Sequence, residues 1–264
     1  MSGKEIVKQD DYSHLKIMTG AEEVKGLAPL SEEMMLVPRI KLVQPLSDEV
    51  SAMKYQAGIL IDSISKDILC EDGSLEIVPI MYKESRLMYH PIDSGGGVKC
   101  MSADGKTGNG DPGGSCLNCQ YRQWAKKYNE KTKKEENVQE CSTVANIVCI
   151  PVNVPVENQY PIIATFMKTS FPTGKKLINS IYQKRVNPWH FKYEIFTELV
   201  KGEKGTYYEM RFKPSGKAPE AIVEYMESIF DLMNEKGYDV HYDEGEMEAE
   251  AEAMADADSD DTFK

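Results

Sequence analysis

Long apolar runs are missing from this chain, and their absence excludes two classes of protein. Nowhere among its 264 residues do about 18 consecutive apolar residues occur, which is the least that a membrane-spanning helix needs. Residues 1–30 contain polar and charged side chains throughout and lack the apolar segment of a secretory signal. The sequence therefore predicts a cytoplasmic protein that is neither secreted nor membrane-spanning.

Catalytic motifs are missing as well. The chain has no G-x4-G-K-[S/T] loop to cradle a phosphate, no nucleophile elbow, and only four histidines, which are scattered. A zinc deaminase would need a proline before its C-x2-C pair, whereas Ser115 precedes Cys116 here. We therefore expect a protein that is not an enzyme.

Cysteine is too scarce for a disulfide scaffold, since a chain of this length has only six. Four of them, Cys100, Cys116, Cys119 and Cys141, have the spacing C-x15-C-x2-C-x21-C within a glycine- and lysine-rich insertion, residues 93–141. The insertion has too few large apolar residues to form a core of its own. The C-x2-C pair can place two thiolates on one tetrahedral ion, and the other two cysteines complete a closed, structural zinc site.

Two alternatives remain open for this quartet. His90 is an alternative fourth ligand, and the four cysteines could also be ordinary reduced thiols without a metal. Cys70 and Cys149 lie in or beside apolar runs, so we interpret them as small buried hydrophobes.

The body of the chain has a mainly β pattern in an α+β arrangement. Four strand-length runs are rich in β-branched and aromatic residues, at 58–64, 75–82, 144–150 and 161–167. Residues 191–199 and 206–212 flank a glycine-containing turn and predict a hairpin, and two amphipathic helices are expected at 173–182 and 218–233. Mostly sequential strands with a helix before the final hairpin predict an antiparallel barrel of the five-stranded oligonucleotide-binding (OB) type.

Charge is distributed unevenly along the chain. The formal net charge is −12, and residues 243–264, with ten carboxylates and one lysine, carry −9 of it, which leaves −3 for the rest. Such a charge run predicts a disordered acidic tail. We divide the chain into a loosely ordered arm, 1–36, an OB-like domain that contains the zinc-stabilised insertion, 37–242, and the tail, 243–264.

Acidic residues are absent from 158–193, a stretch that mixes cations with aromatic rings. This combination suits single-stranded DNA, because cations bind phosphates and unpaired bases stack on rings. We assign Phe166 and Tyr182 to the core, and for any ring in a strand burial is the competing interpretation. The candidate DNA contacts in this stretch are Lys168, Lys175, Lys176, Lys184, Arg185, Trp189 and Tyr193.

The insertion repeats the same mixture. Its candidate DNA contacts are Arg122, Trp124, Lys126 and Lys127, with Tyr128 as a further ring on which a base could stack. A third candidate group lies at the strand end that leads into the insertion and consists of Lys83, Arg86 and Tyr89. Stacking gives little sequence preference, because every base has a π-face.

Together these features resemble the single-stranded-DNA-binding proteins of bacteriophages. The resemblance rests on the barrel pattern, the inserted cysteine cluster, the acidic tail and two stretches, LVPRIKLVQPLS at 36–47 and FMKTSFPTGKKL at 166–177. It implies sequestration of single strands during DNA replication, recombination or repair in the infected bacterial cell, with Lys168, Lys175 and Lys176 in the binding groove. It also implies that the tail recruits a polymerase, a helicase or the host RNA polymerase, through Asp260, Asp261 and Phe263.

A second function fits part of the same pattern. A zinc-containing interaction protein, such as a transcription co-activator that contacts polymerase through an acidic tail, would share the cysteines and the tail. The two hypotheses differ in salt dependence, because a strand-coating protein loses affinity for oligo-dT as salt rises. If the first holds, we expect the tail to cover the DNA groove in the free protein and to be displaced by DNA.

Overall fold

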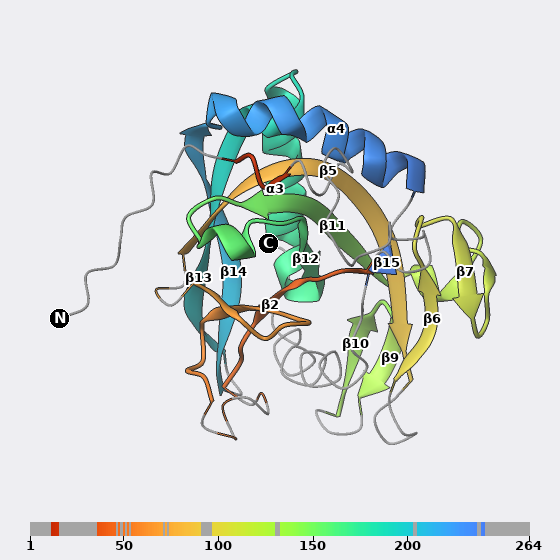
Figure 1. Cartoon of the computed structure of the whole chain (residues 1–264). Helices are drawn as coiled ribbons and strands as arrows, with labels where there is room; N and C mark the ends of the chain where they lie inside the picture. The colour runs from red at the N-terminus through yellow and green to blue at the C-terminus, as the bar shows by residue number, and fades with distance from the viewer. Residues whose placement is uncertain are drawn as a thin grey trace.

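An antiparallel sheet of eight strands forms the centre of the protein, which Figure 1 shows as a computed structural model. The structure describes residues 12–15, 36–45, 47, 50, 52, 54–70, 72, 74–90, 97–129, 133–202, 205–236 and 239–240. Its strands are β1 (Leu36–Val37), β2 (Ile40–Leu42), β3 (Leu60–Asp62), β4 (Ile68–Cys70), β5 (Ser74–Tyr89), β6 (Val98–Ser102), β7 (Thr107–Gly110), β8 (Gly114–Ser115), β9 (Ala125–Asn129), β10 (Lys134–Val138), β11 (Ser142–Pro151), β12 (Ile162–Met167), β13 (Phe191–Gly202), β14 (Gly205–Lys217) and β15 (Asp239–Val240). Its helices are α3 (Phe171–Gln183), α4 (Glu220–Lys236) and the short 3-10 helices η3 (Gln120–Arg122), η4 (Val156–Asn158), η5 (Lys168–Ser170) and η6 (Pro188–His190). Within these described ranges, no helix has the length and apolar character needed to cross a membrane.

Strand β5 is central because it pairs on both sides. On one edge, β5 pairs with nearly the whole length of β11. On its other edge, the first residues of β5 pair with β13. Strand β12 extends the sheet beyond β11, β14 extends it beyond β13, and α3 connects β12 to β13. This is the predicted succession of strands, helix and hairpin, and the mainly β, α+β class is confirmed.

The strands curve toward a barrel, but strand pairing does not close it. On one side of β2, Arg39 forms a parallel bridge with Ile163 of β12. On the other side, the side-chain amide of Gln44 makes two hydrogen bonds to the backbone of Tyr208 on β14. Its Nε2 donates to the Tyr208 carbonyl at 2.8 Å, and its Oε1 accepts from the Tyr208 amide at 2.9 Å. These bonds stand in the place of backbone pairing between two strands. The predicted barrel is therefore partly open at the seam between β2 and β14, as OB-type barrels can be.

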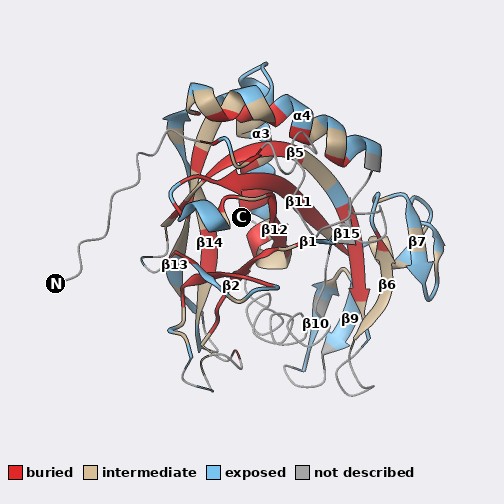
Figure 2. Cartoon of the chain, viewed as in Figure 1, coloured by how far each residue is buried: buried red, intermediate tan, exposed pale blue. Residues whose placement is uncertain are grey.

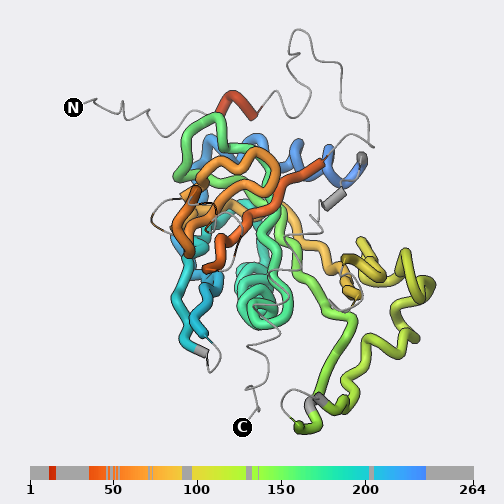
Figure 3. The backbone as a smooth tube through the Cα atoms, turned by 90° about the horizontal axis from the view of Figure 1, so that it is seen from below, coloured from red at the N-terminus to blue at the C-terminus, as the bar shows by residue number. Residues whose placement is uncertain are grey.

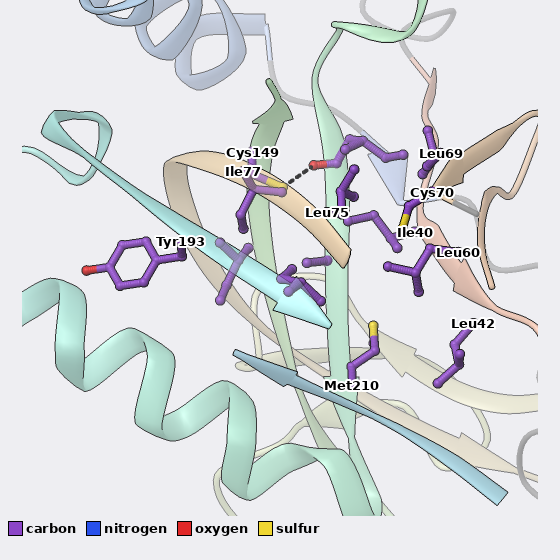
Figure 4. Close-up of a cluster of buried hydrophobic side chains, with 14 of the residues drawn as sticks. Ile40, Leu42, Leu60, Leu69, Cys70, Leu75, Ile77, Cys149, Tyr193 and Met210 are labelled. Atoms are coloured by element: carbon purple, nitrogen blue, oxygen red, sulfur yellow. Dashed lines mark hydrogen bonds between the residues drawn. The ribbon is translucent and has the colours of Figure 1, made fainter. Parts of the chain in front are cut away.

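Apolar side chains fill both faces of the sheet. Strand β11 places Ala145, Ile147 and Cys149 in an inner cluster within the ring of strands, part of which Figure 4 shows. Its alternate residues Val148 and Ile150 enter an outer cluster with α4, and the buried colour of β11 in Figure 2 follows from this double cover. Because both faces are covered, residues 147–150 of this strand form an apolar run without alternation.

Two smaller predictions concern buried residues. Cys70 and Cys149 are both buried, and the Cys149 thiol donates to the carbonyl of Ile162 at 3.4 Å.

In the N-terminal arm, Tyr12 and Leu15 are buried in the outer cluster. Residues 1–11 and 16–35 of the arm, and the whole tail 243–264, lie outside the described residues.

The insertion is an extension of β5. This strand is 16 residues long and extends well past the predicted end at residue 82. Its last residues pair with β6, whereas its first residues pair with β13. The chain then passes through β7, β8, η3, β9 and β10 before it returns in β11, and these strands project to one side in Figure 1. In the described parts of 97–140, Ser102 and Cys116 are the only buried side chains. The insertion therefore has no apolar core there, as the sequence predicts.

Candidate metal centre and nucleic-acid interface

Four cysteines that are far apart in the sequence border one small space at the end of β5. Cys100, Cys116, Cys119 and Cys141 all line it, and its volume is about 10 Å³, roughly that of one water-sized sphere. Cys116 and Cys141 are buried, and the other two are half-buried. His90, the alternative ligand, is exposed and is not among the lining residues. The structure thus brings together the quartet that the spacing singled out.

Backbone pairing holds these cysteines in place. Cys100 is part of β6, which lies along the end of β5. The amide of Cys116 donates to the carbonyl of Lys106 at 2.8 Å, and the amide of Cys141 donates to the carbonyl of Tyr121 at 2.9 Å. These two bonds tie the C-x2-C pair to the β6–β7 turn and the last cysteine to η3, so that distant parts of the insertion meet at one point.

A buried arginine faces the same space. Arg86 of β5 lines it and is 5% exposed. Its Nη2 donates to Oε1 of Glu84 at 3.3 Å, whereas its Nε and Nη1 have no hydrogen-bond partner among the described residues. Burial raises the pKa of the Cys141 thiol, and the positive charge of Arg86 lowers it. The prediction that Arg86 contacts nucleic acid is wrong, because its side chain is enclosed beside the cysteines.

The donor set fits a thiophilic divalent ion, although its atoms are not arranged as ligands. In the part of the chain that the structure describes, no group of three or more His, Cys, Asp or Glu side chains stands in a metal-binding arrangement. The other three cysteines raise the pKa of Cys141, since like charges repel. A tetrahedral zinc site would need all four cysteines as thiolates at about 2.3 Å from one ion.

Helix α3 presents lysines to solvent because its other face packs on the barrel. Leu177 is fully buried and Ile181 packs against the inner cluster, while Lys175 and Lys176 are exposed. No carboxylate of the described residues pairs with either lysine, and the stretch 158–193 contains none. The helix therefore offers two cations whose charge is not neutralised locally.

A glycine sets how closely α3 approaches the sheet. A Cβ added at Gly174 would lie 2.6 Å from Cβ of Phe166 on β12, closer than real atoms approach. Phe166 is fully buried, as predicted. The missing side chain at Gly174 thus lets the helix lie directly on β12, with Lys175 and Lys176 immediately after the contact.

The far end of α3 adds two cations and an unexpected ring. Lys184 and Arg185 are exposed, and Lys184 Nζ lies 4.9 Å from the ring centroid of Phe191. Tyr182 is 71% exposed, so its assignment to the core is wrong. Its neighbours Gln183 and Lys184, both polar, were the sequence signal for this exposure.

The group at the end of β5 divides between two faces of the sheet. Lys83 and Tyr89 are each three residues from Arg86. Because successive side chains of a strand point to opposite faces, these two lie on the face opposite Arg86. Lys168 Nζ lies 5.7 Å from the ring centroid of Tyr89, which joins two predicted contacts from different parts of the sequence. Lys83 is half-buried, and this burial lowers the pKa of its ammonium group.

The β9–β10 hairpin carries exposed rings beside paired cations. Trp124, which precedes β9, is 68% exposed, and Tyr128 is 64% exposed. Lys126 lies 3.9 Å from a carboxylate oxygen of Glu135, and Lys127 lies 3.0 Å from one of Glu140. The rings are therefore open to a ligand, whereas these lysines already have acidic neighbours. Arg122, in η3, is half-buried and lines the cysteine space.

Two predicted stacking rings belong to the core. Trp189 is 6% exposed and packs against Phe230 of α4, with 5.7 Å between ring centroids. Tyr193 is 1% exposed in the inner cluster. The prediction that these rings stack on bases is wrong, because Trp189 is enclosed under α4 and Tyr193 within the inner cluster. The sequence showed cations around them but not the packing of α4.

Figure 3 shows how the remaining candidates are arranged. Seen from below, α3 lies between the β13–β14 hairpin on one side and the insertion on the other. In this view the exposed cations belong to the central helix, and the exposed rings Trp124 and Tyr128 belong to the insertion that lies beyond it. Asp260, Asp261 and Phe263 of the tail lie outside the described residues.

The chain was compared with protein families, curated proteins and solved structures. Residues 8–238 match a family model described as Pam3 phage gp34-like protein, and this match spans most of the chain. No curated protein and no solved structure matches the chain.

Proposed function

We propose a function for a chain that belongs to the Pam3 phage gp34-like family: it binds single-stranded DNA without sequence preference, and a structural zinc ion orders its insertion. The observation that carries the proposal is the acid-free helix α3 with unneutralised lysines, flanked by an insertion with exposed aromatic rings. Binding of this kind makes or breaks no covalent bond, so we propose no catalytic role.

The phosphate contacts come chiefly from α3 and its far end. Lys175, Lys176, Lys184 and Arg185 are all exposed, and their charges are available to release counterions from a phosphate backbone. Lys168, near the ring of Tyr89, would extend this row toward the end of β5. Lys126 and Lys127 would contribute less, because each would first have to leave its glutamate.

The base contacts come from exposed rings. Trp124 and Tyr128 on the insertion, and Tyr182 on α3, present their faces to solvent, as stacking requires. Each stacked base contributes about 1–3 kcal/mol in proteins of this kind. Trp124 and Tyr128 are rings that the sequence singled out, and Tyr182 takes the place of the buried Trp189 and Tyr193.

Zinc would serve the interface indirectly. Cys100, Cys116, Cys119 and Cys141 would hold the ion, which supplies cross-linking by four strong bonds and no reactive position. The described part of the insertion has almost no buried side chains, so such a cross-link is what would hold Trp124 and Tyr128 in place.

The tail has two proposed roles. Residues 243–264 carry a net charge of −9, and a polyanion of this kind can occupy a cationic surface in place of DNA. Once DNA displaces it, Asp260, Asp261 and Phe263 would be available to a replication or recombination protein, such as a polymerase or helicase, or to the host RNA polymerase.

The test is a titration of labelled oligo-dT by fluorescence anisotropy at about 50 and about 200 mM salt. We expect tight binding at the lower salt and a log-log salt slope that becomes shallower by about 1.4 when Lys175→Ala and Lys176→Ala are combined, about 0.7 for each lost phosphate contact. Lys201→Ala, at an exposed position of β13, is the control and should leave the slope unchanged. If neither the whole chain nor a variant without residues 243–264 binds oligo-dT at the lower salt, the proposal fails and the interaction-protein hypothesis takes its place.

A further inference from the structure

We infer that Arg86 is the built-in counter-charge of a four-thiolate metal centre: its guanidinium lines the same space as the cysteines, has two N–H groups without a partner among the described residues, and sets how tightly the centre holds a divalent ion. This inference rests on the zinc part of the proposed function and not on DNA binding. Arg86 would be a positioning residue, since it would act on the ligands and not on the ion.

The first argument is charge balance. A divalent ion with four thiolates has a net charge of −2, and burying such an anion without a nearby cation costs free energy. Arg86 is 5% exposed and lines the same space as the four cysteines. An arginine keeps its charge under all ordinary conditions, so the compensation is permanent. Arg122 also lines the space but is half-buried, and Glu84 is engaged by one end of the Arg86 guanidinium.

The second argument is the incomplete hydrogen bonding of Arg86. Its Nη2 is held by Glu84, while its Nε and Nη1 are buried without a partner among the described residues. Buried polar groups in proteins are nearly always paired, so two unpaired N–H groups on one charged side chain call for a specific explanation. Metal-bound thiolates accept hydrogen bonds, and second-shell donors of this kind orient and stabilise metal ligands.

The third argument is the position of Arg86 in the sheet. Strand β5 lies between β6, which carries Cys100, and β11, which begins directly after Cys141. Cys100 is opposite Met88, and Arg86 lies two residues before Met88 on the same face of β5. A side chain at this point can reach both sides of the quartet, and Glu84, a further two residues back, fixes its orientation.

The experiment measures metal affinity and stability in the whole chain. Co²⁺ is titrated into the metal-free protein and followed by thiolate-to-metal absorbance, and Zn²⁺ affinity is obtained by competition. For Arg86→Met we expect binding about 10- to 100-fold weaker than in the unchanged chain, the usual effect of losing a second-shell partner. Arg86→Lys, which keeps the charge but not the planar fork, should lie between the two. Lys201→Met removes one positive charge from an exposed part of β13 and should bind the metal as the unchanged chain does.

A purely structural role for Arg86 predicts a different pattern. If Arg86 only packs, Arg86→Met lowers the unfolding temperature equally with and without metal. If it is a counter-charge, Arg86→Met leaves the metal-free protein as stable or makes it more stable, because two buried N–H groups without a partner are gone. It then reduces only the gain in stability that metal provides. Should Arg86→Met fail to fold even with metal, Arg86→Lys decides between the two by the same measurements.

The outcomes separate this inference from the proposed function. Metal affinity in Arg86→Met equal to that of the unchanged chain overturns the inference, and so does an unchanged chain that binds no Co²⁺ or Zn²⁺. A chain that holds metal in an Arg86-dependent way but ignores oligo-dT supports the inference while the DNA proposal fails.

Discussion

The barrel and the insertion are stabilised in different ways. In the barrel, both faces of β11 are packed with apolar side chains, and residues such as Ile147, Phe166 and Ile195 are fully buried. Each such side chain contributes about 1.5–3 kcal/mol when it leaves water. In the described parts of 97–140, by contrast, only Ser102 and Cys116 are buried. The insertion is held by backbone pairing and, in our proposal, by one metal ion.

This difference explains why the two parts suit different roles. A surface built on a packed barrel is rigid, and α3 fixes its lysines through the close contact of Gly174 with Phe166. A segment without a core can expose Trp124 and Tyr128 because its order does not depend on burying them. The four predictions below test this contrast, beginning with the largest expected effect.

Metal removal should disorder the insertion and leave the barrel folded. Structural zinc supplies apparent binding energies of about 10–16 kcal/mol in small zinc domains. We expect chelation, or Cys116→Ala, to abolish hydrogen-exchange protection in β6–β10, while β11 and β12 remain protected. The purified chain should contain roughly one zinc ion. Cys149→Ala, which removes a thiol of the barrel, is the matched control and should keep the ion. Unchanged protection of the insertion after Cys116→Ala would remove the metal from the account.

Truncation of the barrel tryptophan should reduce stability without touching the interface. Trp189 packs against Phe230 under α4, so Trp189→Ala should lower the free energy of unfolding by about 3–5 kcal/mol. Urea denaturation measures this loss. Below the unfolding transition, oligo-dT affinity should be unchanged, and a specific loss of affinity would place Trp189 in the interface after all.

Truncation of the insertion tryptophan should do the reverse. Trp124 is 68% exposed, so Trp124→Ala should change the free energy of unfolding by less than about 0.5 kcal/mol. It should weaken binding of oligo-dT by about 1–3 kcal/mol, the contribution of one stacked base. Trp124→Phe keeps a ring and should recover most of the loss. Full affinity in Trp124→Ala would show that this ring does not stack.

The smallest effect is expected at a turn of the insertion. Asp104 accepts hydrogen bonds from the amides of Thr107 and Lys106 and from the Ser102 hydroxyl, and these bonds lower the pKa of its carboxyl to about 2. Because this pKa is lower than its ordinary value of 3.8, the contribution of the carboxylate is complete above pH 3.8 and is lost as the pH falls toward about 2. Asp104→Asn at neutral pH should therefore speed hydrogen exchange at Lys106 and Thr107 only, and unchanged exchange there would contradict it.

The sequence predicted the parts of the fold that follow local patterns. The last hairpin, α3, α4 and strands β11 and β12 appear close to their expected positions, because each has a clear apolar period or run. The extension of β5 to Tyr89 was missed, because it depends on pairing with β6 and not on local propensity. The short strand β2 was missed as well, since its antiparallel pairing with β3, a distant part of the chain, defines it.

The candidate sites were predicted less evenly. The spacing singled out four cysteines, and the structure places them around one small space. Their role as metal ligands stays a prediction. Spacing does not predict whether a single aromatic ring or cation is buried or exposed. Trp189 and Tyr182 lie in the same cationic stretch, yet one is buried and the other is exposed, and only the packing of α3 and α4 separates them. Arg86 was placed at the DNA for the same reason, since its sequence neighbours do not reveal that it faces the cysteines.

The most direct test of DNA binding uses the two tryptophans of the chain. Trp189→Phe leaves Trp124 as the single tryptophan, so its fluorescence reports on the insertion alone. With oligo-dT at about 50 mM salt we predict saturable quenching, with an affinity that falls as salt rises by a log-log slope of about −0.7 per neutralised phosphate. Fluorescence that does not respond to oligo-dT at this salt, even after residues 243–264 are removed, would contradict the account.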